Sequence, residues 1–186
     1  ANDDFILPVD AQIISQGLVS ITALGISTNL DVGALIALDG FISAPNATVT
    51  GGIYNDRINI TRLQAGLTMD VDGKAGADKI WLRDRLSRFG GTLNVVGGDN
   101  PSGYDNEDKL WLDDSANLTA ATGLVTSSAV TGFGMSATVS FTEIEKLEVF
   151  LGQGSDTVTV QSTLDSIYTV INGANGNDTF NVSNAN

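Results

Sequence analysis

The sequence contains no cysteine and no histidine among its 186 residues. Disulfide bridges are therefore excluded, and so are metal sites built on thiolate or imidazole ligands. Ser-His-Asp and Cys-His catalytic arrangements are excluded for the same reason. The chain is long enough for one sizeable domain with its own core. The metal ligands that remain available are oxygen atoms of carboxylates and backbone carbonyls.

Basic residues are scarce as well. Nine Lys and Arg stand against 22 Asp and Glu, which gives a formal net charge of -13. This balance argues against nucleic acid as a partner, because counterion release requires clustered Lys and Arg. It suits divalent cations, which take carboxylate and carbonyl oxygens as ligands. Acidity also keeps a secreted protein soluble, so both interpretations stay open.

Long apolar runs are missing too. No stretch of about 18 apolar residues occurs, so no membrane span is encoded. The apolar stretch at 33–42, "GALIALDGFI", is short and contains Asp39 and Gly40. No signal peptide is visible at the first residues, and the chain is expected to be a mature or excised form. With 21 glycines and many Val, Ile, Thr and Asn, the composition favours strands over helices.

One pattern occurs five times: a turn rich in Gly or Asn, an Asp, one spacer residue, and an apolar–x–apolar strand. The five aspartates are Asp56, Asp78, Asp108, Asp156 and Asp178. Two of the gaps between them are 22 residues, the gap of 30 contains the loop "GGDNPSGYDNE", and the gap of 48 is close to two periods. A period near 22 residues is too long for a hairpin meander. It is typical of one coil of a parallel β-helix.

The apolar residues after each Asp support this fold. Successive strand residues point to opposite faces, so the residues two and four positions after each Asp are expected to point inward together. These pairs are Ile58/Ile60, Ile80/Leu82, Leu110/Leu112, Val158/Val160 and Phe180/Val182. A second strand precedes the turn in "TMDVDG", "TLNVVGG" and "KLEVFLG". The sequence therefore predicts an all-β parallel β-helix, or β-solenoid, with coils of about 22 residues and Gly/Asn/Asp corners.

The repeat divides the chain into two parts. Residues 51–186 carry the Asp motif and are expected to form the β-solenoid. Residues 1–50 lack the motif but keep apolar runs punctuated by Gly and Asp, so they are expected to form N-terminal coils with degenerate corners in the same solenoid. A separate small β-domain is the alternative. The Thr-, Ser- and Gly-rich segment 115–140 is expected to complete coils and to add an excursion at the edge.

The corners resemble the nonapeptide repeat of RTX proteins, Gly-Gly-x-Gly-x-Asp-x-apolar-x. In that family, turn carbonyls and Asp carboxylates of adjacent coils bind calcium, so the resemblance implies Ca²⁺ at these corners. Glycine permits the backbone conformations that aim carbonyls at one point, and Asp adds a hard oxygen ligand. No corner here is complete: Ala174 and Tyr54, for example, stand where the family has Gly.

The implied calcium ligands lie mainly in the last two corners. The full set is Asp156, Asp178, Gly154 and Gly176, followed by Asp78, Asp56 and Asp108. The alternative is that each Asp caps its own turn by accepting hydrogen bonds from backbone N–H groups.

A second resemblance covers residues 50–186. The runs "LEVFLGQGSDTVTV" and "INGANGNDTFNV", in this order and spacing, look like the repeating units of very large bacterial surface proteins. The resemblance implies an RTX-like module of a tandem array, extracellular or at the cell surface, with a structural or adhesin-type role. Its partners would be neighbouring copies or modules, stacked head-to-tail as in a filament, and it would have no enzymatic activity.

Two tryptophans occupy matching positions in the near-identical segments "DKIWLRD" and "DKLWLDD". Alternation sends Trp81 and Trp111 outward, with Lys79 and Lys109 two residues before them on the same face. Such a face can be a protein interface or can bind a glycan such as a surface polysaccharide. The alternative is that a loop, 97–107 or 115–135, covers the indoles. The nearby cluster "RDRLSR" at 83–88 is either a salt-bridged solvated edge or a contact for an acidic polysaccharide or subunit.

Two further functions remain as alternatives to the structural module. One is a calcium-dependent module attached to a secreted enzyme or toxin, which predicts a disordered state without metal. The other is a polysaccharide lyase or epimerase, since those enzymes often use β-helices. Its site would need carboxylates beside a basic residue or Tyr, as in Asp84 with Arg83 or Tyr54 with Arg57. No spacing in the sequence requires that site, and fold analogy alone is weak support.

Overall fold

The computed structural model describes residues 4–23, 33–99 and 107–183. Within these ranges the protein is all-β, apart from one short 3₁₀ helix, η1 (Leu86–Arg88). Two large sheets contain most of the strands, and parallel pairing dominates both. The all-β class and the parallel pairing predicted from the sequence are confirmed.

The first large sheet has seven strands, all paired in parallel. In spatial order they are β1 (Phe5–Leu7), β4 (Leu35–Leu38), β7 (Arg57–Ile60), β9 (Lys79–Leu82), β11 (Lys109–Asp113), β15 (Lys146–Phe150) and β17 (Tyr168–Asn172).

The second large sheet has nine strands. In spatial order they are β3 (Leu18–Thr22), β6 (Asn46–Thr50), β8 (Thr68–Asp72), β10 (Thr92–Val96), β14 (Val139–Thr142), β13 (Ala129–Gly132), β12 (Thr122–Val125), β16 (Thr157–Val160) and β18 (Thr179–Val182). A third, two-stranded sheet joins β2 (Gln12–Ile14) and β5 (Phe41–Ser43).

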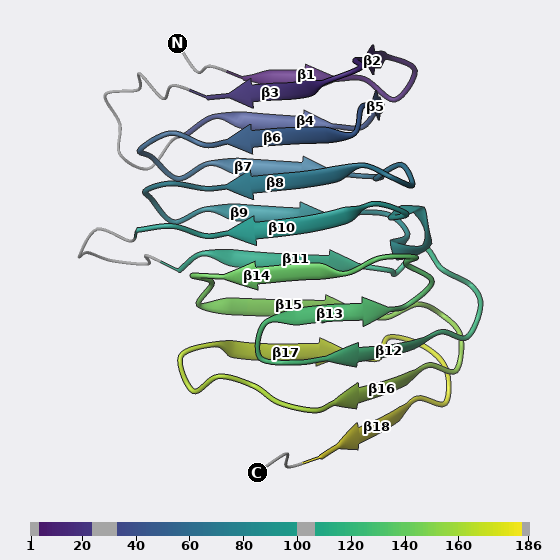
Figure 1. Ribbon diagram of the computed structural model, residues 1–186. Helices are drawn as coiled ribbons and strands as arrows, with labels where there is room; N and C mark the ends of the chain where they lie inside the picture. The colour runs from purple at the N-terminus through teal and green to yellow at the C-terminus, as the bar shows by residue number, and fades with distance from the viewer. Residues whose placement is uncertain (1–3, 24–32, 100–106, 184–186) are drawn as a thin grey trace.

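The chain alternates between the two large sheets. In Figure 1 the strands of the seven-stranded sheet run in one direction and most strands of the nine-stranded sheet run back, while the chain advances from the N-terminal to the C-terminal end. We call one strand of each sheet, consecutive in the chain, a level; β7 and β8 form one level. Arg57 of β7 pairs with Lys79 of β9, so neighbouring levels are 22 residues apart there. The 22-residue period of the sequence is the distance from one level to the next.

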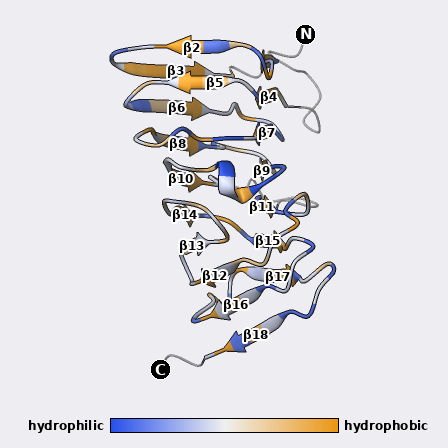
Figure 2. Ribbon diagram, turned by 90° about the vertical axis from the view of Figure 1, so that its right-hand side faces the viewer, coloured by the Kyte–Doolittle hydropathy of each residue, from blue (hydrophilic) through white to orange (hydrophobic). Residues whose placement is uncertain are grey.

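The core lies between the two sheets. Side chains that alternate inward along each strand stack on their equivalents in the next level, as Ile58 does on Ile80 and Ile60 on Leu82. All four are fully buried. Fully burying one such side chain contributes roughly 1.5–3 kcal/mol. The hydropathy colouring in Figure 2 shows apolar segments on stacked strands such as β3, β5 and β6.

The first 50 residues join the same two sheets. Strand β4 pairs in parallel with β7, and β6 pairs in parallel with β8. Strands β1 and β3 continue the two sheets outward from β4 and β6. The described part of this segment is therefore continuous with the repeat region in both sheets.

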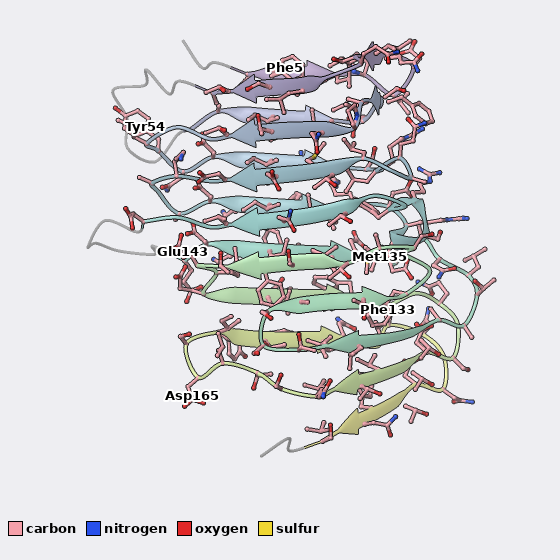
Figure 3. All side chains as sticks on the ribbon, viewed as in Figure 1. Phe5, Tyr54, Phe133, Met135, Glu143 and Asp165 are labelled. Carbon is pink, nitrogen blue, oxygen red and sulfur yellow. The ribbon has the colours of Figure 1, made fainter. Side chains whose placement is uncertain are left out.

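An inserted hairpin interrupts the alternation after β11. Strand β13 pairs antiparallel with both β12 and β14, and this meander gives the nine-stranded sheet two more strands than the other sheet. Phe133 and Met135, which lie at the end of this insertion in Figure 3, are buried. The Phe133 ring packs directly on Gly123, where any larger side chain would meet the ring. The expected excursion within residues 115–140 is thus an insertion in the middle of a sheet rather than at its edge.

The insertion moves the two sheets out of step. Two extra strands at about 4.8 Å each displace the later strands of the nine-stranded sheet by about 10 Å relative to the other sheet. In Figure 1, β16 and β18 accordingly lie beyond β17 at the C-terminal end. Phe180 and Val182 of β18 point toward the core side but are 48% and 79% exposed. They lack the opposing strand that buries their equivalents in the middle levels.

The insertion also corrects one sequence interpretation. Asp56, Asp78 and Asp108 immediately precede strands of the seven-stranded sheet, whereas Asp156 and Asp178 precede strands of the nine-stranded sheet. The 48-residue gap is close to two periods in length, but it does not return the Asp motif to the same corner. The hairpin uses part of a period, so the Asp motif reappears at the opposite corner of the level.

Candidate functional site: a carboxylate ladder and a basic–aromatic face

The corner aspartates form hydrogen bonds with the backbone of two levels. Asp56 accepts the amide of Gly52 in its own turn and the amide of Ala34 in the preceding level. Its side chain is 1% exposed. A buried carboxylate with two amide donors holds two segments of backbone at a fixed distance.

The same contact repeats from level to level. The Asp56 amide donates to Asp78 Oδ1 at 2.7 Å, and the Asp78 amide donates to Asp108 Oδ1 at 2.7 Å. The Asp108 amide donates to Glu145 Oε2 at 2.8 Å. We call this series, Asp56–Asp78–Asp108–Glu145, the carboxylate ladder. Asp78, Asp108 and Glu145 each accept the amide of the acid one level nearer the N-terminus.

A second, shorter series lies at the opposite corner. Asp156 accepts the amides of Ala121, at 2.7 Å, and Gly152, at 3.1 Å. The Asp156 amide in turn donates to Asp178 Oδ1 at 2.9 Å. The two aspartates that the sequence favoured most as ligands are therefore joined through a backbone amide.

Two acids of these corners were missed by the sequence reasoning. Asp114 is fully buried and accepts the Leu86 amide, at 2.8 Å, and the Asn117 side-chain amide, at 3.0 Å. Glu145 ends the ladder and is followed by the same spacer and apolar–x–apolar pattern as the aspartates, with Leu147 and Val149 as the apolar pair, but Glu stands in place of Asp. The turn-forming run "DDSAN" was the available signal for Asp114, and the match of "EKLEV" to "DKLWL" was the available signal for Glu145.

Glycines in the corners allow the close approach of backbone and carboxylate. A Cβ atom added at Gly97 would lie 2.7 Å from Asp108 Oδ2 and would collide with the Glu143 carbonyl oxygen. Gly176 has a φ of 120° and lies directly against the Gly154 carbonyl of the preceding level. Gly154 and Gly176 therefore contribute to close packing between levels.

Burial changes the acidity of the ladder. Desolvation raises the pKa of Asp78 to about 9, the bond from the Asp56 amide opposes this, and the neighbouring charges of Asp108, Asp56 and Asp72 add to it. The Oδ2 atom of Asp78 is buried without a hydrogen-bond partner. Burial likewise raises the pKa of Asp56 and of Asp114. Asp78 is therefore neutral at pH 7.

The arrangement does not fit a calcium site. Calcium takes six to eight oxygen ligands converging on one point, whereas oxygens of Asp56, Asp78, Asp108 and Asp156 accept backbone amides. Among the described residues, no group of three or more acidic side chains is placed to hold a metal ion. Calcium binding at these corners stays a prediction of the sequence motif and carries no part of the argument below.

The outer face of the seven-stranded sheet carries the tryptophans. Trp81 pairs in register with Trp111, and their ring centroids are 4.6 Å apart with an interplanar angle of 53°. Alternation predicted this outward placement. The guanidinium carbons of Arg57 and Arg83 lie 5.0 and 5.2 Å from the centroid of the Trp81 ring, within cation–π range.

A row of cations runs beside the tryptophans on this face. Arg57 pairs in register with Lys79, Lys79 with Lys109, and Lys109 with Lys146. The sequence predicted Lys79 and Lys109 here but missed both ends of the row. We call Arg57, Lys79, Lys109 and Lys146 the basic row. Nearby acids partly balance it, since Glu148 pairs with Lys146, and Glu107 lies 3.7 Å from Lys109.

A cavity of about 300 Å³ opens beside the tryptophans. It is lined by Trp81, Leu82, Arg83, Trp111, Asp113, Glu148 and Phe150. Both indoles are partly exposed rather than fully covered. The predicted covering loop 97–107 lies in part outside the described residues, and the segment 115–135 provides strands β12 and β13 of the other sheet.

No family model matches the chain, and searches of curated proteins and of solved structures found no significant match. Among the residues that the structure describes, no helix is long and apolar enough to cross a membrane.

Proposed function

We propose that the protein is a structural module of an extended extracellular assembly, a parallel β-helix that stacks head-to-tail on further copies of itself. The stacking of parallel levels between two sheets supports the β-helix assignment. The extracellular placement follows from the resemblance of its repeats to RTX-like modules of bacterial surface proteins.

The position of exposed apolar side chains carries this proposal. Four large ones belong to the N-terminal level: Ile6, Val9, Ile14 and Leu18. Four belong to the C-terminal levels: Leu164, Tyr168, Phe180 and Val182. Among the residues that the structure describes, three lie between, namely Phe41, Ile53 and Leu118. An end-to-end contact would bury those on the core side of the last strand, above all Phe180 and Val182.

The edge strands at the two ends also favour head-to-tail stacking. Strands β17 and β18 are the last strands of their sheets at one end, and β1 and β3 are the last at the other. Edge strands present unpaired N–H and C=O groups to an incoming strand. Because the sheets are parallel at these ends, β3 of a second copy can pair with β18 without reversing the chain direction. That strand would continue the nine-stranded sheet past Phe180 and Val182, which have no opposing strand of their own.

Sedimentation velocity over a range of protein concentrations tests the proposal. We expect the mass to grow beyond a dimer as the concentration rises, because head-to-tail contacts do not close. Phe180→Glu with Val182→Glu should abolish this growth. Leu118→Glu is the matched control, since Leu118 is 71% exposed away from both ends.

Three outcomes would contradict head-to-tail stacking. The wild-type protein could remain monomeric at high concentration, or its growth could stop at a dimer through pairing of two C-terminal ends. The Phe180/Val182 variant could also associate as well as the Leu118 control. Circular dichroism of each variant shows whether its fold is retained.

A further inference from the structure

The basic row is unexpected in so acidic a protein. The chain has nine Lys and Arg and a net charge of -13, yet four of the nine lie in register on one sheet face. Neighbouring strands are about 4.8 Å apart, so the row presents one cation at each such step. Glu148 and Glu107 offset part of this charge at Lys146 and Lys109, and an anionic partner along the row would offset the remainder, above all at Arg57 and Lys79.

The tryptophans adjoin the row on the same face. Trp81 and Trp111 lie two residues after Lys79 and Lys109 in the same strands, and therefore point to the same side of the sheet. The cavity beside them adds the Phe150 ring and three charged groups, from Arg83, Asp113 and Glu148. Aromatic rings beside donors and acceptors suit a sugar, whose ring face is apolar and whose rim carries hydroxyl groups.

The volume of the cavity and the spacing of the strands both favour a saccharide as the ligand. A cavity of about 300 Å³ is at the lower end of ligand pockets and suits one or two sugar units. A strand spacing of about 4.8 Å is close to the length that one pyranose unit adds to a linear chain. A polymer with one carboxylate or sulfate per unit could therefore place successive anions along successive cations.

We propose that the outer face of the seven-stranded sheet binds a linear acidic polysaccharide. The basic row, Arg57, Lys79, Lys109 and Lys146, pairs with its anionic groups. Trp111, with Trp81 and Phe150, stacks against a sugar ring in the cavity, and Asp113 and Glu148 accept hydrogen bonds from sugar hydroxyls. This inference is independent of the head-to-tail proposal, because the face lies along the stack rather than at its ends.

Isothermal titration with three probes tests the inference. The probes are oligogalacturonate, which carries a carboxylate on each unit, a sulfated oligosaccharide of similar length, and neutral dextran. We expect binding to one or both anionic probes, weakening as salt rises, and no binding to dextran. The two anionic probes distinguish carboxylated from sulfated ligands.

Matched variants assign binding to this face. Arg57→Gln with Lys79→Gln removes two charges from the row and should lower the affinity by about tenfold or more. Lys74→Gln with Arg88→Gln removes two charges elsewhere and should leave the affinity within about twofold. Trp111→Ala should lower the affinity by about tenfold, and Trp111→Phe should restore part of it.

The inference would be overturned if neither anionic probe bound the wild type, or if dextran bound as tightly as they did. It would also be overturned if the row variant bound no more weakly than the Lys74/Arg88 control. If neither anionic probe binds, an acidic protein is the remaining class of partner that the charge of the basic row favours. The Arg57/Lys79 variant changes only side chains on the outer face, so it keeps the test decisive even if Trp111→Ala fails to fold.

Discussion

The backbone amide of Asp56 donates a hydrogen bond to the Oδ1 atom of Asp78, 22 residues further along the chain and 2.7 Å away. This contact joins two levels through one side chain, and Asp78 repeats it with Asp108. The corner Asp of the repeat therefore has a structural role that requires no metal. It satisfies an amide that the neighbouring strand ladder leaves without a partner.

The pH dependence of stability should depend on Asp78. Its pKa is about 9 in the fold against 3.8 as the ordinary value, because of burial and the nearby charges of Asp56, Asp72 and Asp108. Between these values the folded chain holds a proton that the unfolded chain has lost. The contribution of Asp78 to stability is therefore fully present below about pH 4 and declines as the pH rises toward 9, by at most about 1.4 kcal/mol per pH unit.

Asp78→Asn should reduce that decline, because an amide does not titrate and keeps the oxygen that accepts the Asp56 amide. Urea unfolding at pH 5 and pH 8 measures the difference. Asp165→Asn, at the exposed corner labelled in Figure 3, serves as the control. Equal pH dependence in the Asp78 variant and the wild type would show that Asp78 is charged in the fold. Part of the slope should remain, since burial also raises the pKa of Asp56 and Asp114.

Gly97→Ala should destabilise the protein by about 1–3 kcal/mol. The added methyl group would lie 2.7 Å from Asp108 Oδ2 and would collide with the Glu143 carbonyl. Gly17→Ala is the matched control, because nothing lies within 4 Å of a Cβ atom added there. Denaturant midpoints of the two variants provide the comparison. Similar midpoints would mean that the corner relaxes without cost.

Asp156→Ala should cost about 2–5 kcal/mol, because the amides of Ala121 and Gly152 would both lose their acceptor. Asp165→Ala should change the stability by less than about 0.5 kcal/mol. Thermal unfolding followed by circular dichroism measures both. A small effect at Asp156 would mean that water replaces the carboxylate at this corner.

Calcium should have little effect on thermal stability, because the ladder carboxylates already accept backbone amides. We expect the same melting temperature in millimolar calcium and in excess chelator. A rise of several degrees with calcium would instead support the RTX-type site at Asp156 and Asp178. It would also favour the alternative of a calcium-dependent module.

Local periodicity was enough to predict the core. Ile58, Ile80 and Leu110 recur with the strand pattern, and their inward stacking follows from the two-residue period of a strand. The adjacency of Trp81 and Trp111 follows from the same register. These features depend only on distances along the chain within one or two levels.

The hairpin and its consequences were not predictable in the same way. Whether the segment 115–140 lies at an edge or within a sheet depends on how β14 pairs with β10, more than 40 residues earlier. The change of corner between Asp108 and Asp156 follows from that pairing. Glu145 and Lys146 were missed because Glu replaces the Asp of the motif and no Gly- or Asn-rich turn precedes it, although "EKLEV" keeps the spacing of "DKLWL".

The carboxylate ladder has a polarity. In every rung from Asp56 to Glu145 the amide comes earlier in the chain and the carboxylate arrives one level later. When the chain emerges from its N-terminus, as in synthesis or secretion, each new turn delivers the acceptor that the previous turn still lacks. When levels are added from this end, each new level therefore satisfies the free backbone amide of the level before it. Removing the most C-terminal rung instead leaves the Asp108 amide without the Glu145 carboxylate. The fold has a built-in direction of assembly.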